Sequence, residues 1–128
     1  MQREPRYDDV VAEVKTFLRE AVRKARFAGI GADRIAIDPG FGFGKTASHN
    51  LQILRKLGEF RSLEVPIVAG LSRKSTIGHL TGRPVHERLA GSLAMALLAL
   101  EGGAKILRVH DVRETRDVIA VWQAFNDS

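Results

Sequence analysis

The chain has 128 residues, 45% of them apolar, which is enough for one domain with a hydrophobic core; it shows neither a membrane-spanning apolar run nor a signal-peptide pattern, so we expect no membrane partner. Zero cysteines exclude disulfides and thiolate metal sites and are typical of a cytoplasmic protein. The net charge of +5 is spread along the chain, and the few aromatic residues are not interleaved with basic ones, so a solvated surface is favoured over a nucleic-acid-binding face.

Apolar residues recur with helical spacing in four segments, and three short apolar runs separate these segments. The spacing predicts helices over 8–28, 47–60, 86–103 and 114–126, and strands over 34–38, 65–70 and 105–112. Residues 71–83 are expected to form a loop and a glycine-rich connection. The last helix is expected to turn one apolar stripe toward the core, formed by Val118, Ile119, Trp122 and Phe125.

This alternation of helices and strands predicts a parallel sheet with right-handed crossovers. Polar loop residues follow each strand, so the chemistry is expected at the carboxyl ends of the strands, as in a barrel or a doubly wound sheet. A complete eight-stranded barrel takes roughly 200 to 250 residues. We therefore predict an α/β fold, a partial TIM (β/α)8 barrel with about three parallel strands, and a single domain over residues 1–128.

The stretch DPGFGFGKT, which starts at Asp38, has the residue types of a phosphate-binding P-loop but not its spacing. A P-loop has four residues between its two glycines, whereas only three residues separate Gly40 from Gly44. The carboxylate of Asp38 would also repel a phosphate. It is better suited to accept hydrogen bonds from ring N–H or amino donors, with Phe41 and Phe43 walling a pocket for a flat molecule. The alternative is that Asp38 caps its own loop by bonding backbone amides.

Basic side chains follow the other two strands. Arg73 and Lys74 come directly after the second strand, although lone basic loop residues are commonly just solvated. In the third strand, Arg108 and His110 share one face because side chains alternate along a strand. Burying such a pair is costly unless an anion meets it, and a phosphate or diphosphate fits because Arg offers two parallel donors. The alternative partners of this basic pair are the carboxylates that follow it, Asp111 and Glu114.

Three long motifs occur in order, namely DPGFGFGKT-x-x-HN, VPIVAGLSRKS-x-IG and RVHDV-x-ET. Together with the opening MQREPRYDDVVAEV, they resemble the C-terminal part of dihydropteroate synthase, from after the fifth barrel strand. Dihydropteroate synthase is a transferase of folate biosynthesis and the target of sulfonamides. The resemblance covers essentially the whole chain, whereas the chain corresponds to only about the last half of the family's barrel.

The resemblance implies condensation of 6-hydroxymethyl-7,8-dihydropterin diphosphate with p-aminobenzoate, which gives 7,8-dihydropteroate and pyrophosphate. By position in the motifs, Asp38 would hydrogen-bond the pterin, and Lys74 would contact both the pterin and the leaving diphosphate. Arg108 and His110 would hold that diphosphate. Because positioned cations stabilise the charge that develops on the leaving group, Lys74, Arg108 and His110 are the implied catalytic residues.

The remaining implied substrate-binding residues lie in the same motifs. Phe43 and Ser75 would border the p-aminobenzoate site, and Gly70 and Arg73 complete the set. The family uses Mg²⁺, whose protein ligand is expected outside this chain, so no metal ligand is expected among these residues. Family members commonly pair through helices of this region, which implies a homodimer that binds small-molecule substrates.

The family's earlier strands carry further pterin ligands, the asparagine that helps to bind magnesium and a mobile loop, and none of these is in this sequence. We therefore expect weak or no turnover by the chain alone, since positioned charge stabilisation fails when half of the site is missing. The alternative is a non-catalytic pterin- or phosphate-binding module, or a half-barrel that assembles with another chain. The open edges of a three-stranded sheet favour such assembly.

Overall fold

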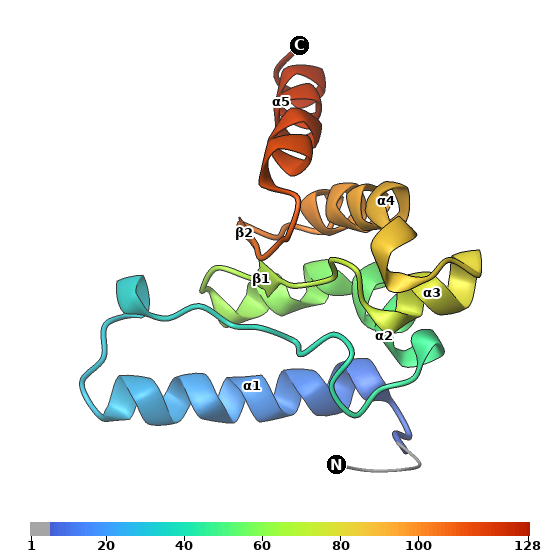
Figure 1. Cartoon of the computed structure of the whole chain (residues 1–128). Coiled ribbons are helices and arrows are strands. Elements are labelled where there is room, and N and C mark those ends of the chain that lie inside the picture. Colours follow the sequence, from blue (N-terminus) through green and yellow to red (C-terminus); the bar gives the residue numbers. More distant parts are fainter. Residues whose placement is uncertain (1–5) are drawn as a thin grey trace.

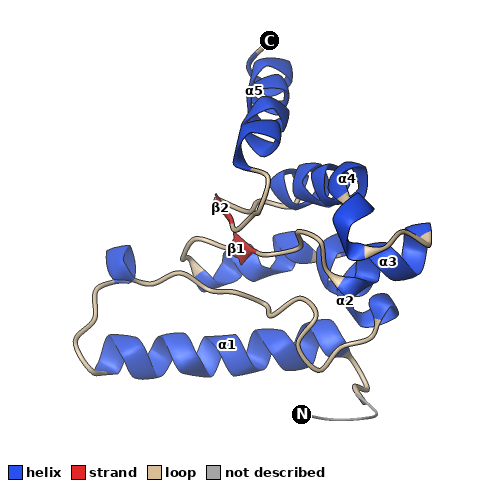
Figure 2. Ribbon diagram, viewed as in Figure 1, coloured by secondary structure: helices blue, strands red, loops and turns tan. Residues whose placement is uncertain are grey.

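The computed structural model describes residues 6–128, so the first five residues, with which the MQREPRYDDVVAEV motif opens, lie outside the described residues. The α-helices are α1 (Val10–Phe27), α2 (Ala47–Arg55), α3 (Ser75–Thr81), α4 (Leu89–Glu101) and α5 (Val112–Asp127). The strands are β1 (Val68–Ala69) and β2 (Ile106–Leu107), and 3-10 helices occupy η1 (Ala32–Arg34), η2 (Leu57–Leu63) and η3 (Val85–Glu87). Most of the ribbon is therefore helical, and the strands are short (Figure 2).

The parallel segments keep the predicted order but form less regular sheet than expected. β1 pairs with β2 in parallel, with Ala69 opposite Leu107. The strand predicted over 34–38 is wrong as a regular strand, because this segment contributes only a parallel bridge between Ile37 and Ile67. Among the described residues, each outer segment pairs only with the middle segment, and the ladder of backbone hydrogen bonds is short. The three segments still run in one direction, and their carboxyl ends meet at one edge.

Two helical segments differ from the predicted ones. The helix predicted over 47–60 is divided, since α2 ends at Arg55 and a 3-10 helix follows. α3 lies where a loop was predicted. Its sequence STIGHLT contains glycine and β-branched residues, which are poor helix formers, so the sequence does not indicate a helix there. Tertiary contacts compensate, and Thr76 and Ile77 are almost fully buried. No helix within residues 6–128 combines the length and apolar character needed to cross a membrane.

The hydrophobic core lies between α1, α2, the 3-10 helix η2 and the sheet. Ile53, Leu57 and Phe60 have no exposed surface, and α1 contributes Val10 and Val11. In Figure 1, α1 runs along one side of the chain, and α2 and the short strands lie between it and α4. The core thus packs against the parallel segments and leaves their carboxyl ends accessible.

α5 does not enter this core, which corrects the prediction for its apolar stripe. Thr115 is its one buried residue, Phe125 is 75% exposed, and Trp122 is only partly buried. The helix packs mainly on α4 and projects away from the remainder of the chain (Figure 1). The amphipathic pattern therefore correctly predicts a helix with an apolar side, of which Val118, Ile119 and Trp122 are partly buried and Phe125 is exposed.

Candidate ligand site at the carboxyl ends of the parallel segments

The loop after the first parallel segment is a turn built by three glycines and closed by a lysine. Gly40, Gly42 and Gly44 have φ values of 75°, 88° and 62°, in the left-handed region that disfavours other residues. The ammonium of Lys45 donates to the carbonyl oxygens of Gly40 and Phe43, both at 3.0 Å. The side chain of Lys45 is therefore bonded to its own loop.

The charged ends of the first and third segments meet at the sheet edge. An oxygen of Asp38 accepts from the Arg108 guanidinium at 2.7 Å, and the other oxygen accepts from the Gly40 amide at 2.8 Å. Asp38 therefore caps its loop and also pairs with a cation from a segment 70 residues away. The side chains of Arg108 and Asp38 are 54% and 34% exposed, so this pair faces solvent and is accessible to a ligand.

The alternative partners considered for Arg108 are engaged elsewhere. Asp111 pairs with Arg73, and Glu114 contacts Arg113 at the start of α5. Both Arg108 and His110 are exposed, so this basic pair is not buried in the chain. Arg108 is thus directed toward Asp38 at the sheet edge and not toward Asp111 or Glu114, which follow it in the sequence.

Gly70 gives Arg108 the space to reach Asp38. In the strand pairing, each residue of the middle segment lies opposite the residue 38 positions later, so Gly70 faces Arg108. A Cβ atom at Gly70 would lie 2.5 Å from Nη2 and 2.6 Å from Cζ of Arg108. Real Cβ contacts are not this short, so any side chain at position 70 would displace the guanidinium.

Lys74 approaches the same site from the start of α3. Its ammonium donates to the Phe41 carbonyl oxygen at 2.6 Å and lies 5.0 Å from the centre of the Phe43 ring. Phe43 is 66% exposed, whereas Phe41 is 1% exposed and belongs to the core. The prediction that both phenylalanines wall a pocket is therefore wrong for Phe41, and only Phe43 faces the site.

The two lysines of the site lie in a partly desolvated environment. Partial burial lowers the pKa of Lys74, and the neighbouring Arg108 lowers it further, while the Asp38 carboxylate acts in the opposite direction. Burial also lowers the pKa of Lys45, again opposed by Asp38. Protonated lysine is thus less favoured here than in water, which suits a site that gains stability when an anion arrives.

These causes predict how the pKa of Lys74 responds to substitution. Arg108→Gln is expected to raise this pKa toward its ordinary value, and Asp38→Asn is expected to lower it further. The ¹³Cε chemical shifts of the lysines, followed against pH, measure both changes. Arg113→Gln, on exposed surface of α5, is the control. A Lys74 midpoint that is the same in all four chains would contradict the proposed coupling.

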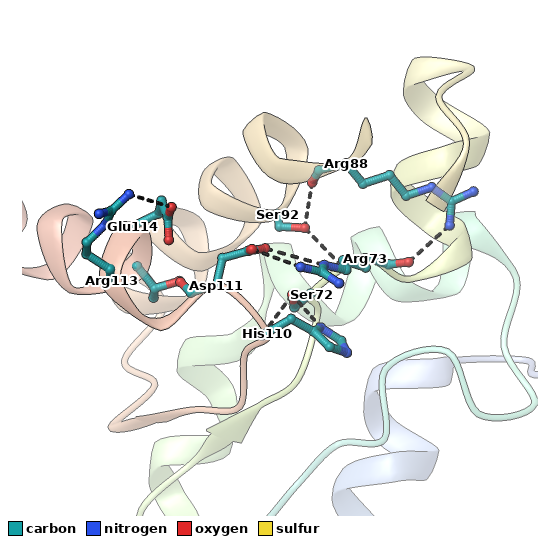
Figure 3. Close-up of polar contacts among 9 residues, drawn as sticks. Ser72, Arg73, Arg88, Ser92, His110, Asp111, Arg113 and Glu114 are labelled. Carbon is teal, nitrogen blue, oxygen red and sulfur yellow. Dashed lines mark hydrogen bonds and ion pairs between the residues drawn. The ribbon is translucent and has the colours of Figure 1, made fainter. Parts of the chain in front are cut away.

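A second polar cluster joins the two loops that follow β1 and β2 (Figure 3). His110 bonds Ser72 through its backbone amide at 3.3 Å and through Nδ1 at 2.9 Å. The Arg73 guanidinium donates to both oxygens of Asp111, at 2.8 and 3.4 Å. Both pairs keep the 38-residue offset of the strands, so side chains continue the sheet register where the backbone no longer pairs.

Arg73 is turned away from Asp38 by its backbone. Its φ of 56° lies in the left-handed region, and Ser92 of α4 and Arg88, the N-cap residue of α4, hold this conformation by two hydrogen bonds. The Arg73 amide donates to Ser92 Oγ at 2.9 Å, and its carbonyl accepts from Arg88 at 3.0 Å (Figure 3). Consecutive side chains therefore diverge: Arg73 contacts Asp111, while Lys74 lies beside Phe43.

The structure thus brings together Asp38, Arg108, Lys74 and Phe43, with Gly70 beneath the guanidinium. Ser75 is exposed at the first position of α3. His110 and Arg73 belong to the neighbouring cluster. Ser72 is a residue of this cluster that the motifs do not indicate, and the constant offset between GLSRKS and RVHDV is the signal that pairs it with His110.

Residues 1–110 match the family of pterin-binding enzymes, and the chain belongs to this family. Its relatives within the family are dihydropteroate synthases. The enzyme of Haemophilus influenzae is 49% identical over 124 residues, which cover 97% of this chain and 45% of that protein.

Solved structures agree with this relationship. The Xanthomonas albilineans dihydropteroate synthase in complex with 7,8-dihydropteroate is 52% identical, with a TM-score of 0.95 over 100% of this chain and 49% of that chain. A dihydropteroate synthase structure from the same organism with 4-aminobenzoic acid gives 53% identity and a TM-score of 0.95 over 98% of this chain and 46% of that chain. The resemblance to dihydropteroate synthase and the partial TIM barrel are therefore confirmed, and the chain spans less than half the length of these relatives.

Proposed function

We propose that this chain supplies one half of a dihydropteroate synthase site, for the condensation of 6-hydroxymethyl-7,8-dihydropterin diphosphate with p-aminobenzoate. The observation that carries the proposal is the 2.7 Å contact between Asp38 and Arg108 at the edge where Lys74 and Phe43 also lie. A carboxylate that accepts N–H donors beside cations that bind phosphate matches the two ends of a pterin diphosphate. The neighbouring structures with 7,8-dihydropteroate and 4-aminobenzoic acid support the same substrates.

In the proposed arrangement, Asp38 accepts hydrogen bonds from the pterin, and Lys74 contacts the pterin and the diphosphate. Arg108 and His110 bind the diphosphate, with His110 held by Ser72. When the methylene carbon–oxygen bond breaks, its electron pair moves to the diphosphate, and the fixed cations stabilise that charge. The amine of p-aminobenzoate forms a bond to the methylene carbon and loses a proton.

The substrate contacts around p-aminobenzoate complete the proposal. Phe43 offers an exposed ring face, and Ser75 lies next to Lys74 at the start of α3. Gly70 contributes by leaving space for the Arg108 side chain. Arg73 contributes by joining its loop to Asp111 through an ion pair.

Magnesium, implied by the resemblance, does not find a site among the described residues. Residues 6–128 contain no group of three acidic, His or Cys side chains that could hold a metal ion. Asp38 is bonded to Arg108 and to the Gly40 amide. The metal therefore stays a prediction, and the proposed roles involve protein side chains only. A cytoplasmic location and a homodimer also stay predictions.

Calorimetry with the pterin diphosphate and a coupled pyrophosphate-release assay test the proposal. We expect the chain to bind the diphosphate and to show weak or no turnover, because positioning groups from the other half of the barrel are needed for the reaction. Absence of binding to the folded chain would overturn the proposed function. Turnover near the enzyme median of about 10 s⁻¹ would instead contradict the expected weakness of the isolated half site.

A half-barrel that assembles with another chain is the second candidate, and the outer segments of the sheet favour it. Ile106 of β2 is 46% exposed, and Phe17 of α1, beside the first segment, is 72% exposed. Light scattering distinguishes the two: a stable monomer at all concentrations would count against obligate assembly. Adding the part of the Haemophilus influenzae enzyme that this chain does not cover is expected to restore turnover if such assembly occurs.

A further inference from the structure

A buried asparagine lies beneath the proposed site and belongs to none of the roles above. Asn50, in the first turn of α2, is 3% exposed. Its side-chain oxygen accepts from the Gly42 amide at 2.9 Å, and its side-chain nitrogen donates to Thr76 Oγ1 at 2.8 Å. Because a backbone N–H can only donate, this orientation of the carboxamide is fixed by its partners.

The two partners of Asn50 belong to the two elements that border the site. Gly42 separates Phe41, which is buried, from Phe43, which faces solvent, and its φ of 88° produces this reversal. Thr76 is 4% exposed and follows Ser75 at the start of α3. One carboxamide therefore connects the loop that carries the Phe43 ring to the helix that begins beside Lys74.

A second contact between the same two elements lies on the solvent side. The Lys74 ammonium donates to the Phe41 carbonyl oxygen at 2.6 Å and lies over the Phe43 ring. That contact is formed by a flexible, partly exposed side chain, whereas the Asn50 contact is buried. The buried carboxamide is thus better placed to keep the loop and α3 at a constant separation when a ligand engages Lys74.

We infer that Asn50, acting with Thr76, is a positioning residue that sets the separation between the Phe43 ring and the Lys74–Ser75 end of α3. Only the identity of the ligand rests on the proposed function, in which p-aminobenzoate binds between these groups. Asparagine is a poor residue for a helix interior, and Leu or Met at this position would favour α2 more. Its presence is explained by the two hydrogen bonds that only a carboxamide makes here.

Paired substitutions at Thr76 test the inference without altering a residue of the site. Thr76→Val removes the hydroxyl at nearly constant shape, and Thr76→Ser keeps it. Ile53→Val, in the fully buried part of α2, is the control for lost stability without a lost hydrogen bond. The readout is the nuclear Overhauser contact between the Phe43 ring and the Lys74 side-chain methylenes.

We expect this contact to be lost in Thr76→Val and retained in Thr76→Ser and Ile53→Val. Retention in Thr76→Val would overturn the inference, and so would equal loss in Ile53→Val, which would indicate a general effect of stability. In the unaltered chain, the Gly42 amide is expected to exchange with deuterium at least about tenfold more slowly than the Gly44 amide. Equal exchange rates would overturn the inference even if Thr76→Val does not fold.

Titration with p-aminobenzoate separates this inference from the proposed function. If the unaltered chain binds it, Thr76→Val is expected to bind about tenfold more weakly, whereas Thr76→Ser binds normally. If the unaltered chain does not bind it, the role of p-aminobenzoate fails, while the Phe43–Lys74 contact still decides whether Asn50 positions the loop.

Discussion

Replacing Asp38 by asparagine is expected to weaken binding of the pterin diphosphate about 100-fold. The carboxylate is proposed to accept charge-assisted hydrogen bonds, each of which contributes about 1.5–3 kcal/mol. An amide of the same shape turns one donor toward either the ligand or Arg108, so one favourable contact becomes repulsive. Since about 1.4 kcal/mol corresponds to a tenfold change in affinity, the lost contact and the repulsion that replaces it, together about 3 kcal/mol, give the stated factor.

Titration calorimetry of the Asp38→Asn chain measures this effect. Asp117→Asn, which removes an exposed carboxylate of α5, is the matched control for net charge. The exposed pair with Arg108 is expected to contribute less than about 1 kcal/mol to folding, so the variant should unfold near the temperature of the unaltered chain. Unchanged affinity in a folded Asp38→Asn chain would refute the proposed pterin contact.

The second large effect is expected from Gly70→Ala, which adds one carbon atom. The new Cβ would lie 2.5 Å from Nη2 of Arg108, so the guanidinium must leave its position over the sheet edge. Because the displaced group is the end of a flexible side chain, the cost to folding is small. Affinity for pyrophosphate is expected to fall at least about tenfold, since a two-pronged Arg contact contributes about 1.5–3 kcal/mol.

A double-mutant cycle makes this prediction specific to Arg108. Gly70→Ala is expected to have little further effect on pyrophosphate binding in a chain that already carries Arg108→Gln. Gly58→Ala is the control, because a Cβ there meets no atom closer than 3.9 Å. Equal losses from Gly70→Ala with and without Arg108 would show that the added methyl acts by another route.

The sequence predicts those features of the site that depend on the direction of the parallel segments. Asp38 and Arg108 come at the ends of apolar segments, and parallel segments bring those ends to one edge. The helical spacing of apolar residues is also sufficient to predict most helices. It does not predict α3, whose poor helix formers are held by burial of Thr76 and Ile77.

Other features depend on contacts that a single sequence does not show. Phe41 and Phe43 have the same local pattern, and only the conformation at Gly42 sends one into the core and the other to solvent. Arg73 and Lys74 are adjacent in the sequence, yet the left-handed backbone conformation of Arg73 directs its side chain to Asp111. The stripe of α5 indicates an apolar side correctly, but periodicity does not specify which surface that side meets.

The two bonds already made by Asp38 have a consequence for ligand entry. A carboxylate has about four acceptor positions, and among the described residues Asp38 uses two, for the Gly40 amide and Arg108. The remaining lone pairs are free while the side-chain torsions are already restrained. An incoming heterocycle would therefore meet an acceptor whose rotational entropy was lost during folding, and neither protein partner would have to leave.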